Sequence, residues 1–342
     1  MPLKPASSIR TSRPLSRRLR GGAGQNRPGD EPPAAESVSA PRPLKPSTAE
    51  VPTALRVATY NIHKGVIRDL FGLRRVSRIH ELRDRLHELD ADLVFLQEVQ
   101  GRHTRHAEHF ESWPDEPQDQ FLAKSPTLRH TFETAYGRNA NYLHGHHGNA
   151  LLSRFPILGR ENRDVSDHAL EKRGILHCRV DVGGREVHCF VAHFGLLARS
   201  RARQAEALID WIAREVPSDA PLIVAGDFND WRNQLSPRLC DSLGVHEVFD
   251  VVNAGSRVTE RVVRFVRDRL AERGAVEVAS RLPRMVRAVR TARTYPALVP
   301  WLRMDRIYVR GFEVRDAQVL RGAQWAQLSD HSPLFADLHL MP

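Results

Sequence analysis

Three hydrophobic stretches of this 342-residue chain end at, or begin from, a small group of polar side chains. They are "DLVFLQEV" (92–99), "LIVAGDFND" (222–230) and "LSDHSPL" (328–334). A stretch such as "LIVAG" is apolar enough to be a buried strand, and a carboxylate at the end of a buried strand is costly unless something neutralises it. An Asp after a strand is often only a turn residue, but the repeated pattern predicts core strands whose ends meet at one polar site.

The segment "GILHCRVDVGGREVHCFVAHF" (174–194) is the clearest β-hairpin in the sequence. Gly183 and Gly184 supply the positive φ angles that a two-residue turn requires. Folding the segment at this turn pairs Cys178 with Cys189. The chain has three cysteines and no CxxC pair, so we expect the paired cysteines to be buried thiols in a reducing compartment.

Hydrophobic periodicity places further strands and helices along the chain. Alternation predicts a strand at the start of "LRVATYNIHKG" (55–65), and apolar residues at spacings of three and four predict a helix over 76–89. The other predicted strands are 92–98, 150–158, 221–226, 304–311 and 332–340, and the other predicted helices are 200–215 and two within 257–293. Crossover helices combined with antiparallel hairpins indicate an α/β fold in which sheets pack together with helices outside.

The net charge of +10 is concentrated in two segments. Residues 1–53 hold nine Lys and Arg against four Asp and Glu, and residues 257–303 hold twelve Arg against four Asp and Glu. Such basic segments favour an anionic partner, either nucleic acid or an acidic membrane surface. The alternative is a general preference for arginine, since only five of the 51 basic residues are lysine.

Residues 1–53 also contain ten of the 22 prolines, with Ser, Gly and Arg between them. This composition buries too little apolar surface to offset the ordering entropy, so we expect a disordered tail followed by one domain over 54–342. The tail either binds a partner or is an extension without a role. The chain has no run of roughly 18 apolar residues and no secretory signal pattern. We therefore expect a cytoplasmic monomer without a transmembrane segment, with a peripheral membrane location as the alternative.

Four residues at the predicted strand ends, Glu98, Asp227, Asn229 and Asp330, offer hard oxygen ligands. Carboxylates, amides and water suit Mg²⁺ or Mn²⁺, whereas a zinc site favours more His and Cys. A divalent cation is therefore the expected neutraliser of these buried carboxylates.

Two histidines accompany these oxygen ligands. His193 ends a predicted strand, and His331 directly follows Asp330. Histidine exchanges a proton near neutral pH, and an Asp behind it fixes its tautomer and stabilises its charged form. Asp305, at the start of a predicted strand, is the candidate for that Asp. Carboxylates for a metal, a His–Asp pair and amide donors together are what hydrolysis of a phosphodiester requires.

Seven motifs occur in order between residues 55 and 340: "TYNIHKG", "FLQEV", "GNALLSRFPI", "VAHFGL", "VAGDFNDW", "MDRIYV" and "LSDHSPL". Together they resemble the endonuclease/exonuclease/phosphatase superfamily, which includes DNase I, abasic-site endonucleases, neutral sphingomyelinases and inositol-polyphosphate phosphatases. The resemblance implies a DNase I-like four-layer α/β sandwich, in which two mostly antiparallel β-sheets pack face to face with helices outside. It also implies a Mg²⁺- or Mn²⁺-dependent phosphoric ester hydrolase.

The resemblance assigns a role to each candidate residue that matches a family motif. Asn61 and Glu98 are the implied metal ligands, and Asp330 is implied to assist them. His331 is the implied proton-transfer residue, and Asp305 is implied to orient it.

The other implied roles concern water and phosphate. Asp227 and Asn229 are implied to position the attacking water and the phosphate. His193 resembles a histidine that lies near the phosphate, and Arg173 in "KRGIL" resembles an arginine that contacts it. Asn149 in "GNALLSR" is expected to approach the phosphate from a core strand.

A closer resemblance links the chain to one bacterial branch of the family, through "YNIHKG", "HHGNALLSRFPI", "ENRDVSDHALEKRGIL" and "GDFNDWRNQL". Genes of that branch are often found beside a cardiolipin synthase gene, which implies phospholipid chemistry by analogy. A phospholipid or another small phosphodiester is therefore the expected substrate.

Relative to that branch, the Arg-rich stretch 257–293 looks like a helical insertion. We expect it to rim the cleft and recruit an anionic surface, and the alternative is a solvated helical hairpin with no binding role. Two other functions stay open: a DNA or RNA nuclease, and a catalytically idle binding module on the same fold. An idle module would have lost the metal Glu or the Asp–His pair, and neither is lost here.

Overall fold

The computed structural model describes residues 54–68, 74–124, 131–168, 171–255, 265–266, 269 and 290–342. The chain divides into two units, residues 1–48 and 49–342, and every described residue belongs to the second unit. The predicted disordered tail 1–53 and most of the predicted helical insertion 257–293 lie outside the described residues. Both therefore stay predictions.

Two six-stranded sheets form the body of the second unit. The first sheet contains β1 (Ala54–Asn61), β4 (Leu93–His103), β5 (Glu133–Tyr142), β6 (Gly145–Ser153), β13 (Phe312–Val319) and β14 (Leu334–Leu340). The second sheet contains β7 (Ile157–Asp164), β8 (Gly174–Val182), β9 (Arg185–His193), β10 (Leu222–Asp227), β11 (His246–Glu247) and β12 (Asp305–Arg310). A separate hairpin consists of β2 (Val66–Arg68) and β3 (Arg75–Ser77).

The strand order is β13-β14-β1-β4-β6-β5 in the first sheet and β11-β12-β10-β9-β8-β7 in the second. Strand β1 pairs in parallel with β4, and β9 pairs in parallel with β10. The other neighbouring strands of the two sheets are antiparallel. The prediction of two mostly antiparallel sheets is confirmed.

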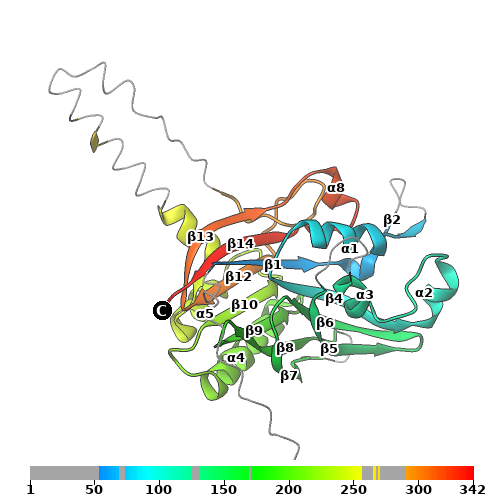
Figure 1. Cartoon of the computed structure of the whole chain (residues 1–342), viewed down its shortest axis with the longest axis horizontal. Coiled ribbons are helices and arrows are strands. Elements are labelled where there is room, and N and C mark those ends of the chain that lie inside the picture. Colours follow the sequence, from blue (N-terminus) through cyan, green and yellow to red (C-terminus); the bar gives the residue numbers. More distant parts are fainter. Residues whose placement is uncertain are drawn as a thin grey trace, which may run out of the picture. The chain divides into compact units, whose positions relative to one another are not determined.

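Short helices connect and cover the strands. They include α1 (Ile79–Glu88), α2 (Thr104–His109), α3 (Gln118–Ala123), α4 (Ala198–Glu215), α5 (Ser236–Leu243) and α8 (Ala323–Ala326), with a 3₁₀ turn at His63–Gly65. Figure 1 shows α1 and α3 beside the strands of the first sheet, and α4 and α5 beside those of the second.

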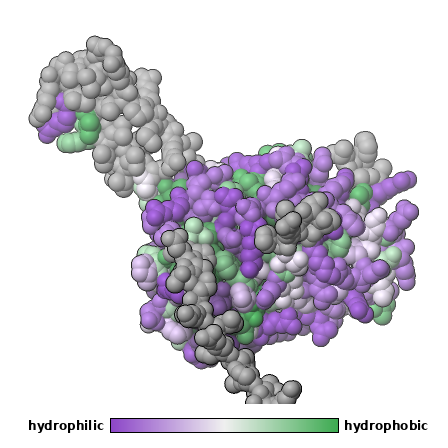
Figure 2. Space-filling model, in the orientation of Figure 1, coloured by the Kyte–Doolittle hydropathy of each residue, from purple (hydrophilic) through white to green (hydrophobic). Residues whose placement is uncertain are grey.

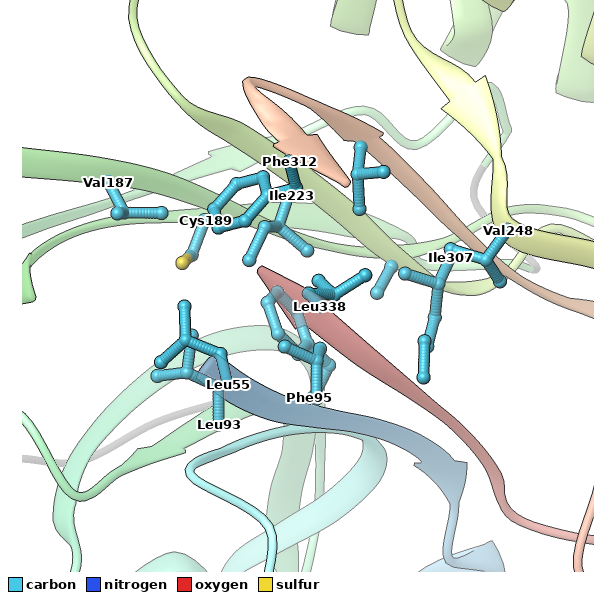
Figure 3. Packing of buried hydrophobic residues seen from close by; sticks show 14 of the residues in the cluster. Leu55, Leu93, Phe95, Val187, Cys189, Ile223, Val248, Ile307, Phe312 and Leu338 are labelled. Carbon is cyan, nitrogen blue, oxygen red and sulfur yellow. The ribbon is translucent and has the colours of Figure 1, made fainter. Parts of the chain in front are cut away.

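Three hydrophobic clusters separate the layers. The first lies between the two sheets, where Leu55 and Phe95 of the first sheet face Cys189 and Ile223 of the second (Figure 3). The second cluster packs the outer face of the first sheet against α1 and α3, and the third packs the outer face of the second sheet against α4 and α5. The four-layer sandwich with helices outside is therefore confirmed.

Alternation along β1 explains why this strand takes part in two clusters. Successive side chains of a strand point to opposite faces of its sheet. Val57 accordingly lies in the cluster between the sheets, whereas Ala58 and Tyr60 lie in the cluster beneath α1. All three side chains are fully buried, so β1 is a central strand covered on both faces.

The predicted hairpin has the register that its Gly-Gly turn requires. Cys178 pairs with Cys189 across β8 and β9, and both Gly183 and Gly184 have positive φ angles. Both cysteines are free thiols in the core between the sheets. Burial raises the pKa of the Cys178 thiol to about 12, which keeps it protonated.

Two of the predicted elements are wrong at their boundaries. The first predicted helix begins at Ile79 and not at Val76, because Val76 belongs to the short hairpin strand β3. The predicted strand 150–158 is two strands, since β6 ends at Ser153 and β7 begins at Ile157. Pro156 lies between them, and proline cannot donate to a strand ladder.

Strands β5 and β13 were not predicted, and β7 was predicted only over its first two residues; each of the three lies at an edge of a sheet. Their sequences, such as "ETAYGRNANY" in β5, mix exposed polar residues with few apolar ones. An edge strand buries less of its surface than a central one, so its hydrophobic pattern is weaker.

Hydrophilic residues predominate on the face of the molecule in Figure 2, and hydrophobic residues form small patches between them. Among the described residues, no helix combines the length and the apolar character that crossing a bilayer requires. The longest described helix, α4, packs a hydrophobic side against the second sheet and turns its charged residues outward, with the exception of the buried Arg201.

Replacing Phe95 by Ala tests how far stability depends on the core between the sheets. Phe95 is fully buried, so the substitution should lower the free energy of unfolding by about 3–5 kcal/mol. Chemical denaturation followed by circular dichroism measures this loss. Leu143→Ala is the matched control, because the Leu143 side chain is 91% exposed and its loss should change stability little. Equal stability of the two variants would contradict the expectation.

Candidate active site

Three ionisable side chains meet at one edge of the second sheet. His193 is the last residue of β9, Asp227 is the last residue of β10, and Asp305 is the first residue of β12. The register places Asp227 directly beside His193 on one side and Asp305 on the other. The parallel pairing of β9 with β10 and the antiparallel pairing of β10 with β12 bring these strand ends together.

A β-bulge directs Glu98 from the first sheet. The pairing of β4 with β6 shifts register between Leu96 and Val99, and Glu98 has a φ angle of +58°. A bulge leaves one residue unpaired and re-aims its side chain, which explains why Glu98 in mid-strand leaves the hydrophobic alternation.

Backbone strain is concentrated around this site. Of the six described non-glycine residues with positive φ, four belong to the segments that form the site: His63, Lys64, Glu98 and Asn229. Such conformations cost free energy and persist only where the surrounding structure imposes them, and they are frequent at functional sites.

Gly226, directly before Asp227, is the glycine that the site requires. Its φ angle is +151°, and a Cβ atom at this position would lie 1.9 Å from the carbonyl oxygen of Ala192. Only glycine allows β10 to approach β9 this closely. The motif "AGDFND" therefore needs glycine at its second position for steric reasons, in addition to its polar residues.

Asp227 is the centre of the polar contacts. Asn61 at the end of β1 donates from Nδ2 to Asp227 Oδ2 across 3.1 Å, which joins the two sheets. The backbone N–H of Asn229 donates to Asp227 Oδ1 across 3.0 Å. His193 Nε2 and His331 Nε2 lie 3.6 and 3.8 Å from Asp227 Oδ2. Burial raises the pKa of Asp227 to about 6, against the opposing attraction of His331.

His331 is held by a buried carboxylate on its other side. Its Nδ1 donates to Asp305 Oδ2 across 2.9 Å, and Thr294 Oγ1 donates to the same oxygen across 2.5 Å. The Tyr295 ring lies 4.9 Å from the imidazole, centroid to centroid. Burial opposes the positive charge of His331, but Asp305 and Asp227 outweigh it and raise its pKa to about 10. His331 therefore carries its proton at neutral pH in this arrangement.

Two neighbouring residues, Lys64 and His63, contact the carboxylates of Glu98 and Asp330. Lys64 Nζ lies 2.5 Å from Glu98 Oε2. His63 Nδ1 lies 3.3 Å from Asp330 Oδ1 and 4.0 Å from Glu98 Oε2. Burial opposes the charge on Glu98, but Lys64 and the nearby histidines hold the pKa of this carboxyl well below its usual range.

The donor set of Glu98, Asp330 and Asn61 fits a hard divalent cation. Two carboxylates and an amide oxygen are ligands that Mg²⁺ and Mn²⁺ prefer. The Glu98 and Asp330 side chains are 17% and 41% exposed, so a cation has access to them from solvent. Asn61 Oδ1 accepts one hydrogen bond, from the His63 backbone N–H, and an amide oxygen has a second lone pair for a ligand.

A second group has ligand atoms that all lie within 4.8 Å of one another, namely those of Asp227, Asp305 and His331. In the described part of the chain it is the one such group of three or more His, Cys, Asp or Glu side chains. Because Asp305 already accepts hydrogen bonds from His331 and Thr294, this group is better suited to holding a proton on His331 than to holding a cation.

The predicted phosphate-binding residues Arg173 and Asn149 are both engaged by other protein groups. Arg173 donates from Nε to the Phe194 carbonyl and from Nη2 to Glu171. Asn149 donates both hydrogens of its amide, to the carbonyls of Gly174 and of the β9 residue Val191. Asn149 thus ties the first sheet to the second, and its remaining oxygen is an acceptor that does not suit a phosphate anion.

Three further residues of the site, His63, Lys64 and Thr294, are not among those predicted from the sequence. The signal for the first two was present, since "HKG" directly follows the predicted strand that ends in Asn61. The rule that selected Glu98 and Asp227, polar side chains at the end of a buried strand, would have selected them as well. Thr294 had no such signal, because its role depends on a contact with Asp305 that only the fold creates.

Comparisons with known proteins agree with this fold. The sequence model of the Endonuclease/Exonuclease/phosphatase family matches residues 58–331 of the chain. The Escherichia coli (strain K12) protein described as "Uncharacterized protein YbhP" is 39% identical over 289 residues, which cover 84% of this chain and 97% of that protein.

Two solved structures are similar as well. The structure of D. rerio TDP2 complexed with single-strand DNA product has a TM-score of 0.54 at 16% identity, and the match covers 84% of this chain and 99% of that one. The Bacteroides thetaiotaomicron mannosyl-6-phosphatase has a TM-score of 0.55 at 18% identity, with 83% and 99% covered. At such identities these two structures show the shared fold alone.

Replacing Asp305 by Asn tests the electrostatic coupling within the site. The substitution removes the carboxylate that most strongly raises the pKa of His331, so this pKa should fall clearly below its wild-type value of about 10, because only Asp227 and Asp330 then oppose the effect of burial. A ¹H–¹⁵N NMR titration of the ring nitrogens in metal-free protein measures the change. Asp84→Asn, on the exposed side of α1, should leave the His331 titration unaltered. An unchanged pKa in the Asp305 variant would show that Asp305 does not control the imidazole.

Proposed function

Because this chain belongs to the endonuclease/exonuclease/phosphatase family of phosphoester hydrolases, we propose that it hydrolyses a phosphodiester with the help of a divalent cation. The observation that carries the proposal is the buried arrangement of Asp305, His331 and Asp227. His331 is fixed through Nδ1, so its Nε2 faces the strand ends where the other candidate residues meet. This geometry supports proton transfer by a His–Asp pair at the reacting phosphate.

The proposed cation is Mg²⁺ or Mn²⁺, held by Glu98 and Asn61 with help from Asp330. When bound, it would supply positive charge to the phosphate oxygens. Lys64 and His63 already contact these carboxylates, so a cation must compete with two protein groups for them. We therefore expect Lys64 to leave Glu98 when the cation binds.

Asp227 and Asn229 are the proposed positioning residues for the attacking water and the phosphate. Asn61 and the Asn229 backbone hold the Asp227 carboxylate in one orientation, which supports this role. His193 is the proposed neighbour of the phosphate, because its Nε2 faces the same carboxylate oxygen as His331. Contacts of Arg173 and Asn149 with the phosphate stay predictions. The structure supports them less than the other roles, because hydrogen-bond donors of both side chains already bind backbone carbonyls.

A phospholipid, or another small phosphodiester, is the proposed substrate class. Exposed hydrophobic side chains lie on three loops that adjoin the catalytic strand ends: Leu196, Leu197, Trp231, Leu298, Val299 and Trp301. These loops follow β9, follow β10 and precede β12. Large apolar side chains gathered beside a site favour contact with an apolar surface, and a lipid interface provides one.

The alternative substrate is nucleic acid. The similar structure of D. rerio TDP2 contains a single-strand DNA product, and the predicted basic insertion 257–293 would attract DNA as well as an acidic membrane. An idle binding module is the least supported alternative, because the metal Glu and the Asp–His pair are both present.

Hydrolysis of bis-p-nitrophenyl phosphate tests the proposed reaction directly. Turnover should require added Mg²⁺ or Mn²⁺, and Glu98→Ala and His331→Ala should each lower kcat/KM by about 10²–10⁴-fold. Glu88→Ala and His246→Ala are matched controls, because both residues are exposed and outside the site. Folded protein that shows no metal-dependent turnover would contradict a phosphodiesterase and favour a narrow monoesterase or an idle module.

Vesicle binding tests the proposed lipid substrate. Leu298→Ser combined with Trp301→Ser removes side chains that are 82% and 62% exposed, so it should lower binding to anionic phospholipid vesicles about tenfold. Turnover of soluble bis-p-nitrophenyl phosphate should not change. Leu158→Ser is the control, because Leu158 is also exposed but lies at the far end of β7 from the site. If the wild type, Leu298→Ser/Trp301→Ser and Leu158→Ser bind vesicles equally well, and if all three bind DNA, the nuclease alternative would be favoured.

A further inference from the structure

Two cavities lead away from the candidate active site. The nearer one has a volume of about 370 Å³ and is lined at one end by His63 and Lys64, the two residues that contact Asp330 and Glu98. The farther one has a volume of about 600 Å³. The two share three lining residues, Arg75, His103 and His106, so they adjoin and form one path outward from the site.

The charged lining of this path is entirely basic among the described residues. Arg74, Arg75 and Arg105 line the farther cavity, and Lys64 and Arg68 line the nearer one. No Asp or Glu is among the lining residues of either cavity in the described part of the chain. Nor do Arg74, Arg75 and Arg105 form an ion pair with any described carboxylate, so their charge is available to a ligand.

Two histidines of this path, His103 and His106, have lowered pKa values and contribute hydrogen-bonding groups more than charge. His103 and His106 stack with their ring centroids 3.9 Å apart, and His106 Nδ1 lies 2.9 Å from Gln100 Oε1. Burial, together with the nearby His103, Arg75, His109 and Lys64, lowers the pKa of His106 to about 4. The neighbours that affect its pKa are therefore cationic or imidazole groups.

These histidines do not form a metal site. His103 Nδ1 accepts a hydrogen bond from the His106 backbone, so one candidate ligand atom is already engaged. Within the described residues, no three of these imidazoles bring their ring nitrogens within 4.8 Å of one another. An anion is the ligand that suits the arginines.

We propose that these two cavities bind a second phosphate group of the substrate while the scissile phosphodiester lies at Glu98 and His331. The inference rests on the proposed function and makes it narrower: the preferred substrate carries two phosphates, one to be cleaved and one to be held. Arg75 and Arg105 are the proposed binding residues for the second phosphate. An arginine guanidinium matches phosphate oxygens with parallel hydrogen bonds, which makes it a better partner for phosphate than a lysine is.

The dimensions of the path favour a compact ligand. Cavities of roughly 300–1,000 Å³ are typical for small molecules, and both volumes lie in that range. The second phosphate can belong to a soluble bisphosphate or to a phospholipid headgroup with two phosphates. The same chemistry recognises both, so the experiment must separate the two sources.

Direct binding of pyrophosphate is the first arm of the test, because it needs no turnover. Isothermal titration of the metal-free full chain compares the wild type with Arg75→Ala/Arg105→Ala. The Arg75 and Arg105 side chains are both exposed to solvent, so their truncation should leave the fold intact. The double variant should bind pyrophosphate about tenfold more weakly, since two charge-assisted contacts are lost. Arg214→Ala/Arg315→Ala removes the same charge from exposed positions outside the path and should bind like the wild type.

Kinetics form the second arm. On bis-p-nitrophenyl phosphate, which has no second phosphate, Arg75→Ala/Arg105→Ala should keep the wild-type kcat/KM. On a soluble diester with an additional phosphate, or on vesicles of a two-phosphate phospholipid, kcat/KM should fall about tenfold through KM. A loss with the soluble diester supports a soluble bisphosphate source, and a loss confined to vesicles supports a lipid headgroup.

The outcomes separate this inference from the proposed function. Equal pyrophosphate binding by the wild type and Arg75→Ala/Arg105→Ala would overturn the second-phosphate site, whatever the enzyme hydrolyses. An equal loss of binding in the Arg214→Ala/Arg315→Ala control would also overturn it, because the effect would then be one of net charge. Absence of turnover on every substrate would instead refute the proposed hydrolase, while weaker binding by the path variant alone would still support the anion site.

Discussion

The burial of Asp227 between two sheets is the constraint on which the site depends. A carboxylate in this position must be compensated, and it receives a hydrogen bond from Asn61 of the first sheet and one from the Asn229 backbone of the second. The protonated imidazole of His331 lies beside it, held by a second buried carboxylate, Asp305. Asn61 is the last residue of β1 and His331 shortly precedes β14, both strands of the first sheet, so the charge balance of Asp227 requires the two sheets to be in register with one another.

The hydrophobic core between the sheets supplies that register. Side chains such as Phe95 and Ile223 interdigitate along the strands, and the strand ends then meet at a common edge. Because close-packed cores tolerate little displacement, polar groups at this edge are held more firmly than loop residues would be. The strained residues Glu98 and Asn229 are stable for the same reason: the ladders and packing around them leave no room to relax.

Net charge alone was a poor guide to the electrostatics of this domain. Outside residues 1–53 and 257–303 the sequence has slightly more acidic than basic residues. The fold nevertheless gathers Arg75 from a short hairpin and Arg105 from a helix around one path beside the catalytic edge. The charge of the side chains that line the path decides which ligands can bind there. This local charge does not depend on the net charge of the whole chain.

The sequence by itself determined the central strands, the hairpin register and the residues at the strand ends, because these depend on alternation, turn chemistry and polarity that are local in the chain. Asp227, Asp305 and His331 could be selected in this way, and the motifs added Asn61. The tertiary structure alone decided which of them touch, and it brought in Thr294 and the path lined by Arg75 and Arg105. It also decided the edge strands β5, β7 and β13, whose half-exposed side chains carry little pattern. A contact between residues far apart in the chain depends on the packing of whole layers, and no short stretch of sequence contains that information.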